Sequence, residues 1–376
     1  MKIAVVIPKY GLIGGAEAFV FELCERLSLR DEFQIHVFAN KWQKGTGPVV
    51  FHKVPIIRFP RFLGPISFAY FANRRIRQDD FVLVHSHERI FEMDLFTFHG
   101  IPHKKWVKTT RNRPLTLFDR ATSWVEQKGI NNHRLQMIMP VSCLAKEEFL
   151  KNYNVPEFKV QVNPPGIDSK RFSDLDSKLC RQEVLQRHGL SPDDIVVLFV
   201  SMNFELKRLD LVLKGIADLS APQNKKLSLK LLVVGKGDTR RFTALARDLG
   251  IAEQVIFAGV TREIEKYYLA SDIFTMPSKF DTFGLAVLEA MTAGLPVIIT
   301  RTVGARDLVE SGVSGFVLSE NPSVSEMTTA LDVLMNRDKR LHMGEHGRQV
   351  ALQHTWKNTV DRVAHLYYQL ATGGKA

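Results

Sequence analysis

Two carboxylates are the side chains of this sequence whose spacing most clearly suggests a chemistry. Asp281 and Glu289 stand eight positions apart in a segment where a strand-like run gives way to a polar loop and then to a helical pattern that stops at Gly294. If both were helical, a rise of about 1.5 Å per residue would place them roughly 12 Å apart. The two carboxylates of a glycosidase lie roughly 5 to 9.5 Å apart, so hydrolysis by this pair is not indicated. The spacing suits two hydroxyl-rich groups on either side of a diphosphate, because a carboxylate accepts two hydrogen bonds from a diol.

Amide and cationic groups that would hold such a diphosphate are also present. The backbone amides of Thr282, Phe283 and Gly284 come at the predicted helix start, where N–H groups and the helix dipole favour phosphate. Lys207 and Arg208 supply positive charge from another segment. A departing diphosphate carries negative charge that preorganised cations and dipoles stabilise. These groups could therefore stabilise a departing diphosphate without a metal.

A glycine-rich turn follows the first strand-like run. Gly14 and Gly15, followed by Glu17, lead into a helical pattern, and adjacent glycines let an anion approach the backbone closely at a helix start. The turn lacks the Gly-x-Gly-x-x-Gly spacing of a dinucleotide site, so a nicotinamide cofactor is disfavoured. A tight strand-to-helix turn without a ligand explains the same residues equally well. Residues 234–238 are a weaker glycine-containing segment, which we interpret as a turn.

Candidate metal ligands are few. Asp174 and Asp176 have the Asp-x-Asp spacing of metal-dependent transferases of another fold, but they lie in a charged, loop-like stretch. His85, His87 and Glu88 follow a strand-like run without a further matched ligand, so a satisfied polar cluster is the better interpretation. We therefore expect neither a bound metal nor another cofactor.

The elements that must position these residues follow a regular alternation. Short β-branched runs alternate with amphipathic segments of helical length, a pattern typical of βαβ units and parallel sheets. In the first half the strand candidates are residues 3–8, 34–39, 81–85, 95–99, 137–141 and 160–163. A second series comprises residues 195–201, 229–235, 255–258, 273–276 and 296–300. The fold class is therefore α/β, with two Rossmann-like, doubly wound sheets.

The domain junction is expected at residues 163–168. There the sequence Asn-Pro-Pro-Gly-Ile-Asp interrupts regular structure, because consecutive prolines remove N–H donors and the glycine frees the backbone. The first domain would comprise residues 1–166 and the second residues 167–352. Residues 353–376 carry a helical apolar stripe, and this helix either closes the second domain or crosses back to the first. Two such domains facing each other would place the carboxyl ends of their strands around a shared cleft, where ligands of such sheets bind.

The composition is that of a globular protein. Of the 376 residues 45% are hydrophobic and 24% charged, enough apolar residues for large cores. Cys24, Cys143 and Cys180 share no metal-ligand spacing and are odd in number, which favours a reducing compartment. No run approaches the roughly 18 apolar residues of a membrane span, and the first apolar run is too short for a signal peptide. The sequence therefore predicts a cytoplasmic protein.

The formal charge of +11 is concentrated in the first half, where residues 1–168 contain 24 basic and 16 acidic side chains. Residues 103–113 are rich in Lys and Arg, and residues 58–63 and 68–77 interleave cations with aromatic rings. These segments form either a solvated rim or a patch that docks on an anionic membrane, where each basic residue contributes about 1 kcal/mol. The charge alone permits nucleic acid binding, but no recognised motif for it is present, so a nucleic acid partner is not expected. Trp42, Trp124 and Trp356 are expected to be packing residues.

The order of these features resembles the retaining family-4 glycosyltransferases of the GT-B fold. The Asp-x7-Glu segment, followed by Ala-Met-x-Ala-Gly-Leu-Pro-Val, is similar to the family's Glu-x7-Glu signature. The glycine turn, the 163–168 junction and the 204–208 segment occur in the family's order. Within the family the chain looks most like the glucosyltransferases of the lipopolysaccharide core. The resemblance implies that residues 1–166 bind the acceptor and residues 167–352 the nucleotide sugar.

The resemblance also assigns roles in the second domain. Glu289 would bind the ribose hydroxyls, and Lys207 would meet the diphosphate with help from Arg208. Asp281 stands where the family has a glutamate near the donor sugar. Because aspartate is one methylene shorter, its contact with the sugar could be direct, bridged by water or lost. The amides of Thr282, Phe283 and Gly284 complete the phosphate site.

The resemblance also implies further contacts with the donor. Many family members have an arginine where this chain has Ser201, so that contact must come from elsewhere, with Arg171 as the candidate. Gly15 would approach the phosphates from the first domain, with Gly14 and Glu17 in the same site. The base would rest near Val260 and Thr261. His99 falls where many members have a histidine beside the reacting sugar.

The implied activity is that of a retaining hexosyltransferase which moves glucose from UDP-glucose to a lipid-linked, anionic core-oligosaccharide acceptor. Front-face attack would leave the acceptor proton on the departing diphosphate, since the sequence offers no strong nucleophile. The enzyme would act in the cytoplasm, peripherally on the inner face of the cytoplasmic membrane. A different nucleotide sugar, such as UDP-N-acetylglucosamine or UDP-galactose, with another glycan acceptor is an alternative. So is a basic membrane- or nucleic-acid-docking module without turnover, whereas an isomerase is disfavoured because the Asp-x7-Glu helix belongs to the transferases.

Overall fold

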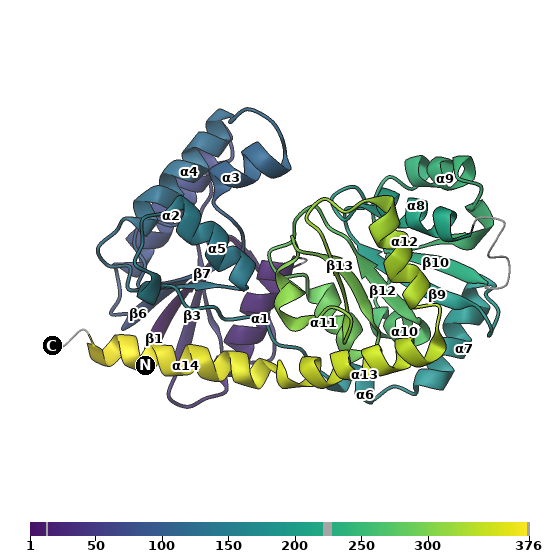
Figure 1. Cartoon of the computed structure of the whole chain (residues 1–376). Coiled ribbons are helices and arrows are strands. Elements are labelled where there is room, and N and C mark those ends of the chain that lie inside the picture. Colours follow the sequence, from purple (N-terminus) through teal and green to yellow (C-terminus); the bar gives the residue numbers. More distant parts are fainter. Residues whose placement is uncertain (13, 221–227, 374–376) are drawn as a thin grey trace. The chain divides into compact units, whose positions relative to one another are not determined.

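The chain forms two compact units. The computed structural model describes residues 1–12, 14–220 and 228–373. One unit consists of Met1–Gly166 and of the chain from Trp356 onward, and the other consists of Ile167–Thr355 (Figure 1). Each is an α/β unit built on one parallel sheet, and each is described by itself.

The first unit has a six-stranded sheet of order β5-β3-β1-β6-β7-β8, in which all paired strands are parallel. The strand order reverses between β1 and β6, so the carboxyl ends of these two strands flank a topological switch point, the usual ligand position in such sheets. The strands are β1 (Lys2–Val6), β3 (Gln34–Ala39), β5 (Val50–Lys53), β6 (Leu83–Ser86), β7 (Leu95–Phe98) and β8 (Met137–Pro140). A separate parallel pair joins β2 (Lys9–Tyr10) to β4 (Lys41–Trp42).

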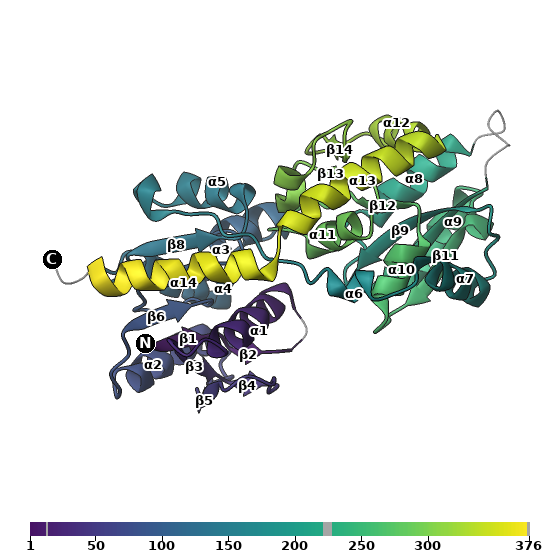
Figure 2. The same cartoon turned by 90° about the horizontal axis from the view of Figure 1, so that it is seen from below.

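The helices of the first unit bury apolar stripes against this sheet. Residues of α2, α4 and α5 share one core cluster with the sheet residues Ala4 and Phe38. Helix α14 contacts α1 and β6 (Figure 2). Its residues Val363 and Tyr367 are fully buried, as the predicted apolar stripe requires. The helices are α1 (Gly15–Ser28), α2 (Leu63–Ile76), α3 (His103–Lys105), a π-helical turn at Trp106–Thr110, α4 (Leu117–Ile130), α5 (Cys143–Asn152) and α14 (Trp356–Gly373).

The second unit repeats the plan. Its sheet has the order β11-β10-β9-β12-β13-β14 with parallel pairs throughout, and the order reverses between β9 and β12. The strands are β9 (Ile195–Ser201), β10 (Leu229–Gly235), β11 (Val255–Gly259), β12 (Ile273–Met276), β13 (Val297–Thr300) and β14 (Gly315–Leu318). The loops after β9 and β12 therefore meet at this unit's switch point.

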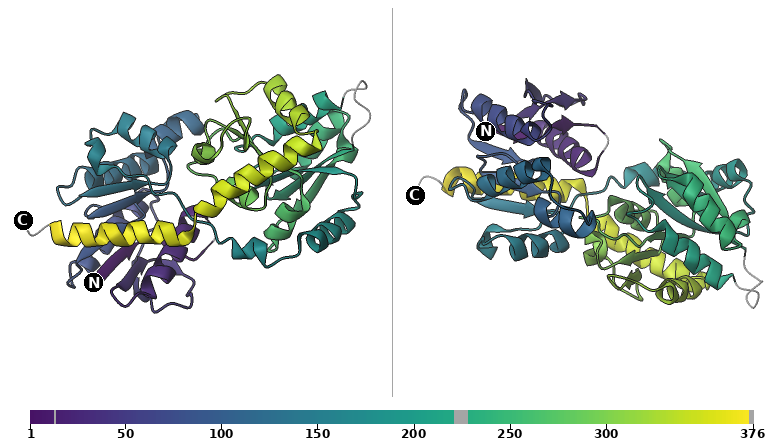
Figure 3. Two further views of the ribbon diagram at one scale, coloured as in Figure 1. Left: turned by 60° about the horizontal axis from the view of Figure 1, so that its bottom comes forward. Right: turned by 90° about the horizontal axis from the view of Figure 1, so that it is seen from above.

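The helices of the second unit begin where polar side chains satisfy free backbone N–H groups. Asp176 caps α7, and Ser323 forms a capping box with Glu326 at the start of α12. The chain then runs through α13 and leaves this unit at Thr355 (Figure 3). The helices are α6 (Lys170–Ser173), α7 (Ser177–His188), α8 (Leu209–Leu219), α9 (Thr239–Asp248), α10 (Ile264–Ala270), α11 (Leu285–Thr292), α12 (Val324–Val333) and α13 (Arg337–Gln353).

The α/β class with two Rossmann-like sheets is confirmed, and so are most of the predicted strands. The strand predicted at residues 160–163 is wrong. This segment donates backbone hydrogen bonds to Ile138 and Pro140 of β8, but it makes only an isolated bridge, at Val160. Pro140 has no N–H with which to return a bond, so a ladder cannot extend there.

Candidate functional site

At the second unit's switch point, Lys207 pairs with Asp281. Lys207 lies in the loop after β9 and Asp281 in the loop after β12, and the ammonium of Lys207 donates to Oδ2 of Asp281. Both side chains are largely buried, with 14% and 24% of their surface exposed. The topology thus brings together two residues that are 74 positions apart in the sequence.

Backbone hydrogen bonds hold the two loops in register. The amide of Lys279 donates to the carbonyl of Leu206 at 2.8 Å, which ties the β12 loop to the β9 loop. The amide of Asp281 donates to the carbonyl of Thr302 at 2.9 Å, and the Asp281 carbonyl accepts from Gly304 at 2.9 Å. Asp281 is therefore fixed between the loops after β9 and β13, and it lies outside the helix that carries Glu289.

Gly284 makes the sharp turn into α11. Its φ of +91° is rarely adopted by residues with a side chain, and an added Cβ would lie 2.8 Å from Cε of Met276 and 2.9 Å from Cγ1 of Val303. The turn that separates Asp281 from the helix therefore needs a glycine at this position.

We expect Gly284→Ala to lower the free energy of unfolding by at least about 2 kcal/mol, because backbone strain and steric overlap both contribute. Gly250→Ala is the matched control, since Gly250 has a φ of +73° but open space around a Cβ. It should cost only about 1 kcal/mol. Urea unfolding of both variants measures the difference, and equal losses would show that the contacts at Gly284 are unimportant.

The amides predicted to receive phosphate are only partly as expected. The N–H of Phe283 donates to Oδ1 of Asp281 at 3.2 Å, so in this structure that amide is already bonded within the loop. The cause is the position of Asp281 two residues earlier, which lets its carboxylate close a local turn onto the backbone. Thr282 is half-buried and Gly284 is buried at the helix start.

Glu289 lies on α11 and accepts a hydrogen bond that the sequence did not indicate. The hydroxyl of Tyr268, on α10, donates to Oε2 of Glu289 at 2.9 Å. The guanidinium of Arg171 lies 3.7 Å from Oε1 and is bonded more closely to Glu265, from Nε at 2.7 Å. Burial raises the pKa of the Glu289 carboxyl, while the Arg171 charge and the Tyr268 hydrogen bond act against this. The Arg171 guanidinium thus lies between the carboxylates of Glu265 and Glu289.

Ser201 and Arg208 shape the loop after β9. Ser201 is buried at the end of the strand, and its Oγ accepts the amide of Asn203 at 2.8 Å. Arg208 takes a left-handed backbone conformation at the start of α8, and its guanidinium donates to the carbonyl of Pro322 at 3.4 Å. Gly237 in the loop after β10 packs against the ring of Phe204, which agrees with its interpretation as a turn.

The residues proposed to face the base follow β11. Val260 is 66% exposed, and Thr261 accepts the amide of Glu263 on its Oγ1 at 3.0 Å. An exposed apolar side chain at the carboxyl end of a strand is available for stacking contacts.

In the first unit the glycine turn forms the start of α1. Gly14 has a φ of +151°, and a Cβ there would overlap the carboxylate of Glu17, which folds back over the turn. Among the described residues, no heavy atom would lie within 4 Å of a Cβ at Gly15. Gly15 is exposed at the helix N-terminus, so its backbone is open to a neighbouring group.

Three histidines gather at the carboxyl ends of β6 and β7. Nδ1 of His87 lies 2.9 Å from Nε2 of His99, and the rings of His85 and His87 are 4.1 Å apart. His85 also contacts Tyr367 of α14 and Thr97, each at 2.7 Å. Burial lowers the pKa of His85 and of His99 to about 3, so both are neutral at physiological pH. The sequence singled out His99 but not its bond to His87, whose Nε2 is buried without a partner among the described residues.

This cluster predicts that the first unit loses stability in acid. Burial lowers the pKa of His87 well below its ordinary value, as it does for the other two, so between pH 6.5 and about 3 the unfolded chain binds more protons than the folded one. Stability is therefore fully present above pH 6.5 and falls as the pH is lowered, by up to about 1.4 kcal/mol per pH unit for each histidine. Thermal unfolding followed from neutral to mildly acidic pH measures the slope. His99→Asn should reduce it and His342→Asn, at an exposed site, should not; a slope unaffected by His99→Asn would contradict this account.

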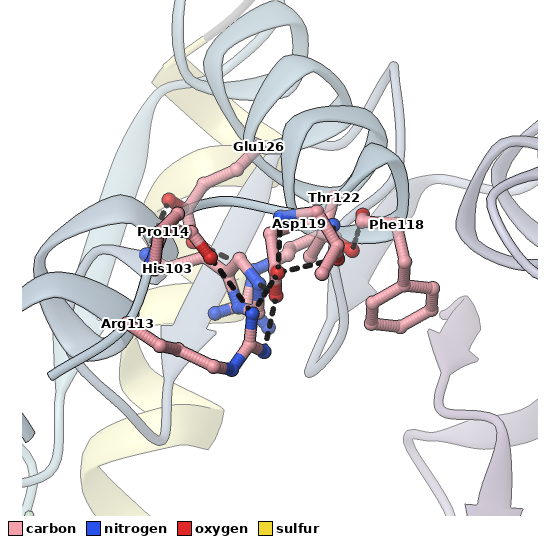
Figure 4. A network of polar contacts seen from close by, with 9 residues as sticks. His103, Arg113, Pro114, Phe118, Asp119, Thr122 and Glu126 are labelled. Atoms are coloured by element: carbon pink, nitrogen blue, oxygen red, sulfur yellow. Dashed lines mark hydrogen bonds and ion pairs between the residues drawn. The ribbon is translucent and has the colours of Figure 1, made fainter. Parts of the chain in front are cut away.

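The basic segment of the first unit is anchored by buried carboxylates. Asp119 accepts from His103 at 2.9 Å and from Arg113 at 2.7 Å, so both ends of residues 103–113 are fixed to α4 (Figure 4). Glu126 lies about two turns further along α4. It accepts hydrogen bonds from Arg89 at 2.6 Å and from the amide of His103 at 2.9 Å. The predicted basic surface is therefore part of the folded unit.

One face of α4 is exposed and both apolar and basic. Leu117 is 67% and Trp124 46% exposed, and Arg120 and Lys128 are exposed on the same helical face. Trp124, expected to be a packing residue, packs its ring against Phe91 but leaves much of its surface exposed. No helix among the described residues is long and apolar enough to cross a membrane.

The candidate metal ligands have other contacts. Asp176 accepts the amides of Lys178 and Leu179 as the cap of α7. Within the described ranges no group of three or more His, Cys, Asp or Glu side chains is arranged to hold a metal ion.

Comparisons with known proteins add the family. A model for Glycosyltransferase Family 4 matches residues 13–171, and one for Glycosyl transferases group 1 matches residues 181–350. The lipopolysaccharide glucosyltransferase WaaG of Escherichia coli K12 is 23% identical over 93% of this chain and 94% of its own. The D-inositol 3-phosphate glycosyltransferase of Corynebacterium jeikeium K411 is 30% identical over 98% of this chain and 94% of its own.

Solved structures agree on the fold. The crystal structure of WaaG has a TM-score of 0.82 at 21% identity and covers 99% of this chain and 100% of its own. That of HepE from Anabaena with UDP-glucose has a TM-score of 0.74 at 18% identity and covers 98% of this chain and 100% of its own. Because a curated glycosyltransferase aligns over nearly the whole chain and the two family models match both halves in order, this protein belongs to the family-4 glycosyltransferases of the GT-B fold.

Proposed function

We propose that this glycosyltransferase moves glucose from UDP-glucose to a lipopolysaccharide core or similar cell-surface glycan, with retention of configuration and without a metal. The proposal that the donor is a nucleotide sugar rests on the buried pairing of Lys207 with Asp281 at the second unit's switch point. A nucleoside diphosphate sugar would offer these two side chains other partners in place of each other: phosphate oxygens for the ammonium and sugar hydroxyls for the carboxylate. The name of WaaG and the UDP-glucose complex of HepE support the choice of donor.

In the proposed reaction the bond between the sugar C1 and the diphosphate oxygen breaks, and a bond from C1 to the acceptor oxygen forms on the same face. The acceptor proton passes to the departing diphosphate, so no protein base is required. Lys207 stabilises the charge that develops on the diphosphate, and Arg208 adds a second positive charge nearby. Glu289 holds the ribose and Asp281 a sugar hydroxyl.

His99 has a defined role in this scheme. Its depressed pKa keeps it neutral, so it acts as a hydrogen-bonding group beside the sugar rather than as an acid or base. The activity should accordingly show no ionisation of this residue near its ordinary pKa of 6.5. A His99 that binds the substrate without transferring a proton is consistent with front-face attack.

The acceptor is proposed to be lipid-linked and anionic, reached from the inner face of the cytoplasmic membrane. Support comes from the exposed face of α4 with Leu117 and Trp124, next to the anchored basic segment at residues 103–113. Apolar side chains flanked by cations bind anionic interfaces through both burial and charge.

Charge reversal tests this docking. In Lys104→Glu with Lys108→Glu, two exposed cations are replaced, whereas Lys105 is left because it pairs with Glu148 at 3.2 Å. We expect binding to vesicles containing anionic phospholipid to weaken by at least tenfold, at about 1 kcal/mol for each cation removed and more for its reversal. Lys41→Glu with Lys44→Glu, outside the basic segment, is the control. Unchanged vesicle binding would remove the membrane from the proposal.

The comparisons also suggest a second class of acceptor. Several relatives are D-inositol 3-phosphate glycosyltransferases, so a small phosphorylated polyol is a second candidate acceptor. The experiment is thermal-shift screening of UDP, GDP, ADP and their glucose, galactose and N-acetylglucosamine conjugates. The best donor is then incubated with a lipid-linked core oligosaccharide and with inositol 3-phosphate. Stabilisation by UDP-glucose and transfer to the lipid-linked acceptor are expected; transfer to the inositol phosphate alone would replace the acceptor, and no transfer would favour a docking module.

A further inference from the structure

Tyr268, whose hydroxyl contacts the Glu289 carboxylate, has no role in the proposed reaction. Tyr268 is fully buried, and its ring packs against Phe172 at 6.1 Å and Phe274 at 5.9 Å between centroids. Aromatic neighbours from α6 and β12 thus fix the ring, and its hydroxyl reaches Oε2 of Glu289 at 2.9 Å. A buried hydroxyl needs a partner, but a packing tyrosine needs no carboxylate from another helix.

The direction of this hydrogen bond is settled by the two groups' protonation. Burial, and then the charge of Glu289, raise the pKa of Tyr268 well above its ordinary value, so the phenol keeps its proton. Tyr268 therefore donates and Oε2 accepts. Oε1 accepts no hydrogen bond within the described residues, and its nearest cation, Arg171, lies at 3.7 Å, beyond hydrogen-bonding distance.

The carboxylate is consequently held by one oxygen and open at the other. A free glutamate side chain must lose rotational freedom before it can accept two hydrogen bonds from a diol, and a fixed one has already lost it. We propose that Tyr268 is a positioning residue, which orients Glu289 for the ribose hydroxyls of the nucleotide, with Arg171 as the second restraint. This inference rests on the proposed binding of ribose by Glu289.

The same helix provides a matched control. Tyr267 is also buried, at 3% exposure, and its hydroxyl contacts Nε2 of His188 at 3.1 Å, away from Glu289. Tyr267→Phe and Tyr268→Phe each remove one buried hydroxyl from α10 and keep the ring. A general effect on folding would appear in both, whereas an effect through Glu289 would appear only in the second.

The test measures the affinity of the full-length protein for UDP and for 2′,3′-dideoxy-UDP by calorimetry. We expect Tyr268→Phe to weaken UDP binding about tenfold and to leave the dideoxy analogue within about twofold, because that analogue has no hydroxyls for Glu289 to bind. Tyr267→Phe should match the wild type for both ligands. In turnover, Tyr268→Phe should raise the KM of the donor more than it lowers kcat.

Two results would overturn the inference. If Tyr268→Phe bound UDP as the wild type does, the hydrogen bond would not position Glu289. If it weakened UDP and the dideoxy analogue equally, Tyr268 would have only a structural role. Failure of the proposed function looks different: Glu289→Gln would then preserve the preference for UDP over its dideoxy analogue.

Discussion

Replacement of Lys207 by alanine is expected to lower kcat/KM for sugar transfer about 100- to 1,000-fold, the range found when one group that stabilises transition-state charge is removed. The reason is that the Lys207 ammonium is largely buried at the switch point, where charge interactions are stronger than in water. The loss should fall mainly on kcat, because the diphosphate gains charge as the glycosidic bond breaks. Steady-state kinetics with UDP-glucose and a lipid-linked acceptor measure it.

Lys279→Ala is the control for this variant. Its side chain is exposed, and the residue lies in the loop that bonds to Leu206, so the change in net charge is the same and nearly in the same place. We expect its kcat/KM to stay within about threefold of the wild type, since exposed charges contribute little. Equal losses in the two variants would show that only the overall positive charge of this region matters. Wild-type activity in Lys207→Ala would remove this residue from the site.

Glu289→Gln is expected to raise the KM for the nucleotide sugar about 10- to 100-fold. Hydrogen bonds to a charged acceptor contribute about 1.5–3 kcal/mol. The neutral amide has only one acceptor oxygen, so it cannot accept one ribose hydroxyl on each of two oxygens. Arg171 would also lose one of its two carboxylate partners. Donor titrations at saturating acceptor measure the KM.

Glu263→Gln controls for the loss of a carboxylate in the same unit. Glu263 is half exposed and pairs with Lys266 on the surface, so its replacement should leave KM and kcat near the wild-type values. The account would be contradicted if Glu289→Gln kept a wild-type KM, or if it lost kcat while its KM stayed the same.

The fold could be predicted in large part because apolar runs of the central strands are buried on both faces. Residues 195–201 and 229–235 were predicted to the residue, and each is a mostly apolar run whose residues are largely buried. The edge strand β5 was missed because its side chains are partly or fully exposed and its apolar signal is correspondingly weak, whereas β14 is apolar but only four residues long. The strand at 160–163 was predicted from composition, but pairing depends on a donor that Pro140 lacks.

The site was predicted less completely, because spacing along the chain reports residues on one element only. Asp281 and Glu289 are close in sequence, whereas Lys207 meets Asp281 only through the strand order of the sheet. Tyr268 is 21 positions before Glu289 and carries no motif, so packing of α10 against α11 alone brings them together.

Hydrogen bonds and ion pairs between the protein's own groups are a second limit on prediction from sequence. Arg171 was the candidate for the phosphate contact that Ser201 cannot make, and in the fold its guanidinium pairs with Glu265 and lies 3.7 Å from Glu289. The Phe283 amide is taken by Asp281. A sequence gives the types of groups available and cannot show which of them satisfy one another in the fold.

A crystal structure of the protein soaked with UDP is the most direct test of the central claim, that the second unit grips a nucleoside diphosphate at its switch point. The account predicts diphosphate oxygens within hydrogen-bonding distance of Nζ of Lys207 and ribose hydroxyls on the carboxylate of Glu289. UDP bound elsewhere on the chain, with the Lys207 and Asp281 pair undisturbed, would contradict it.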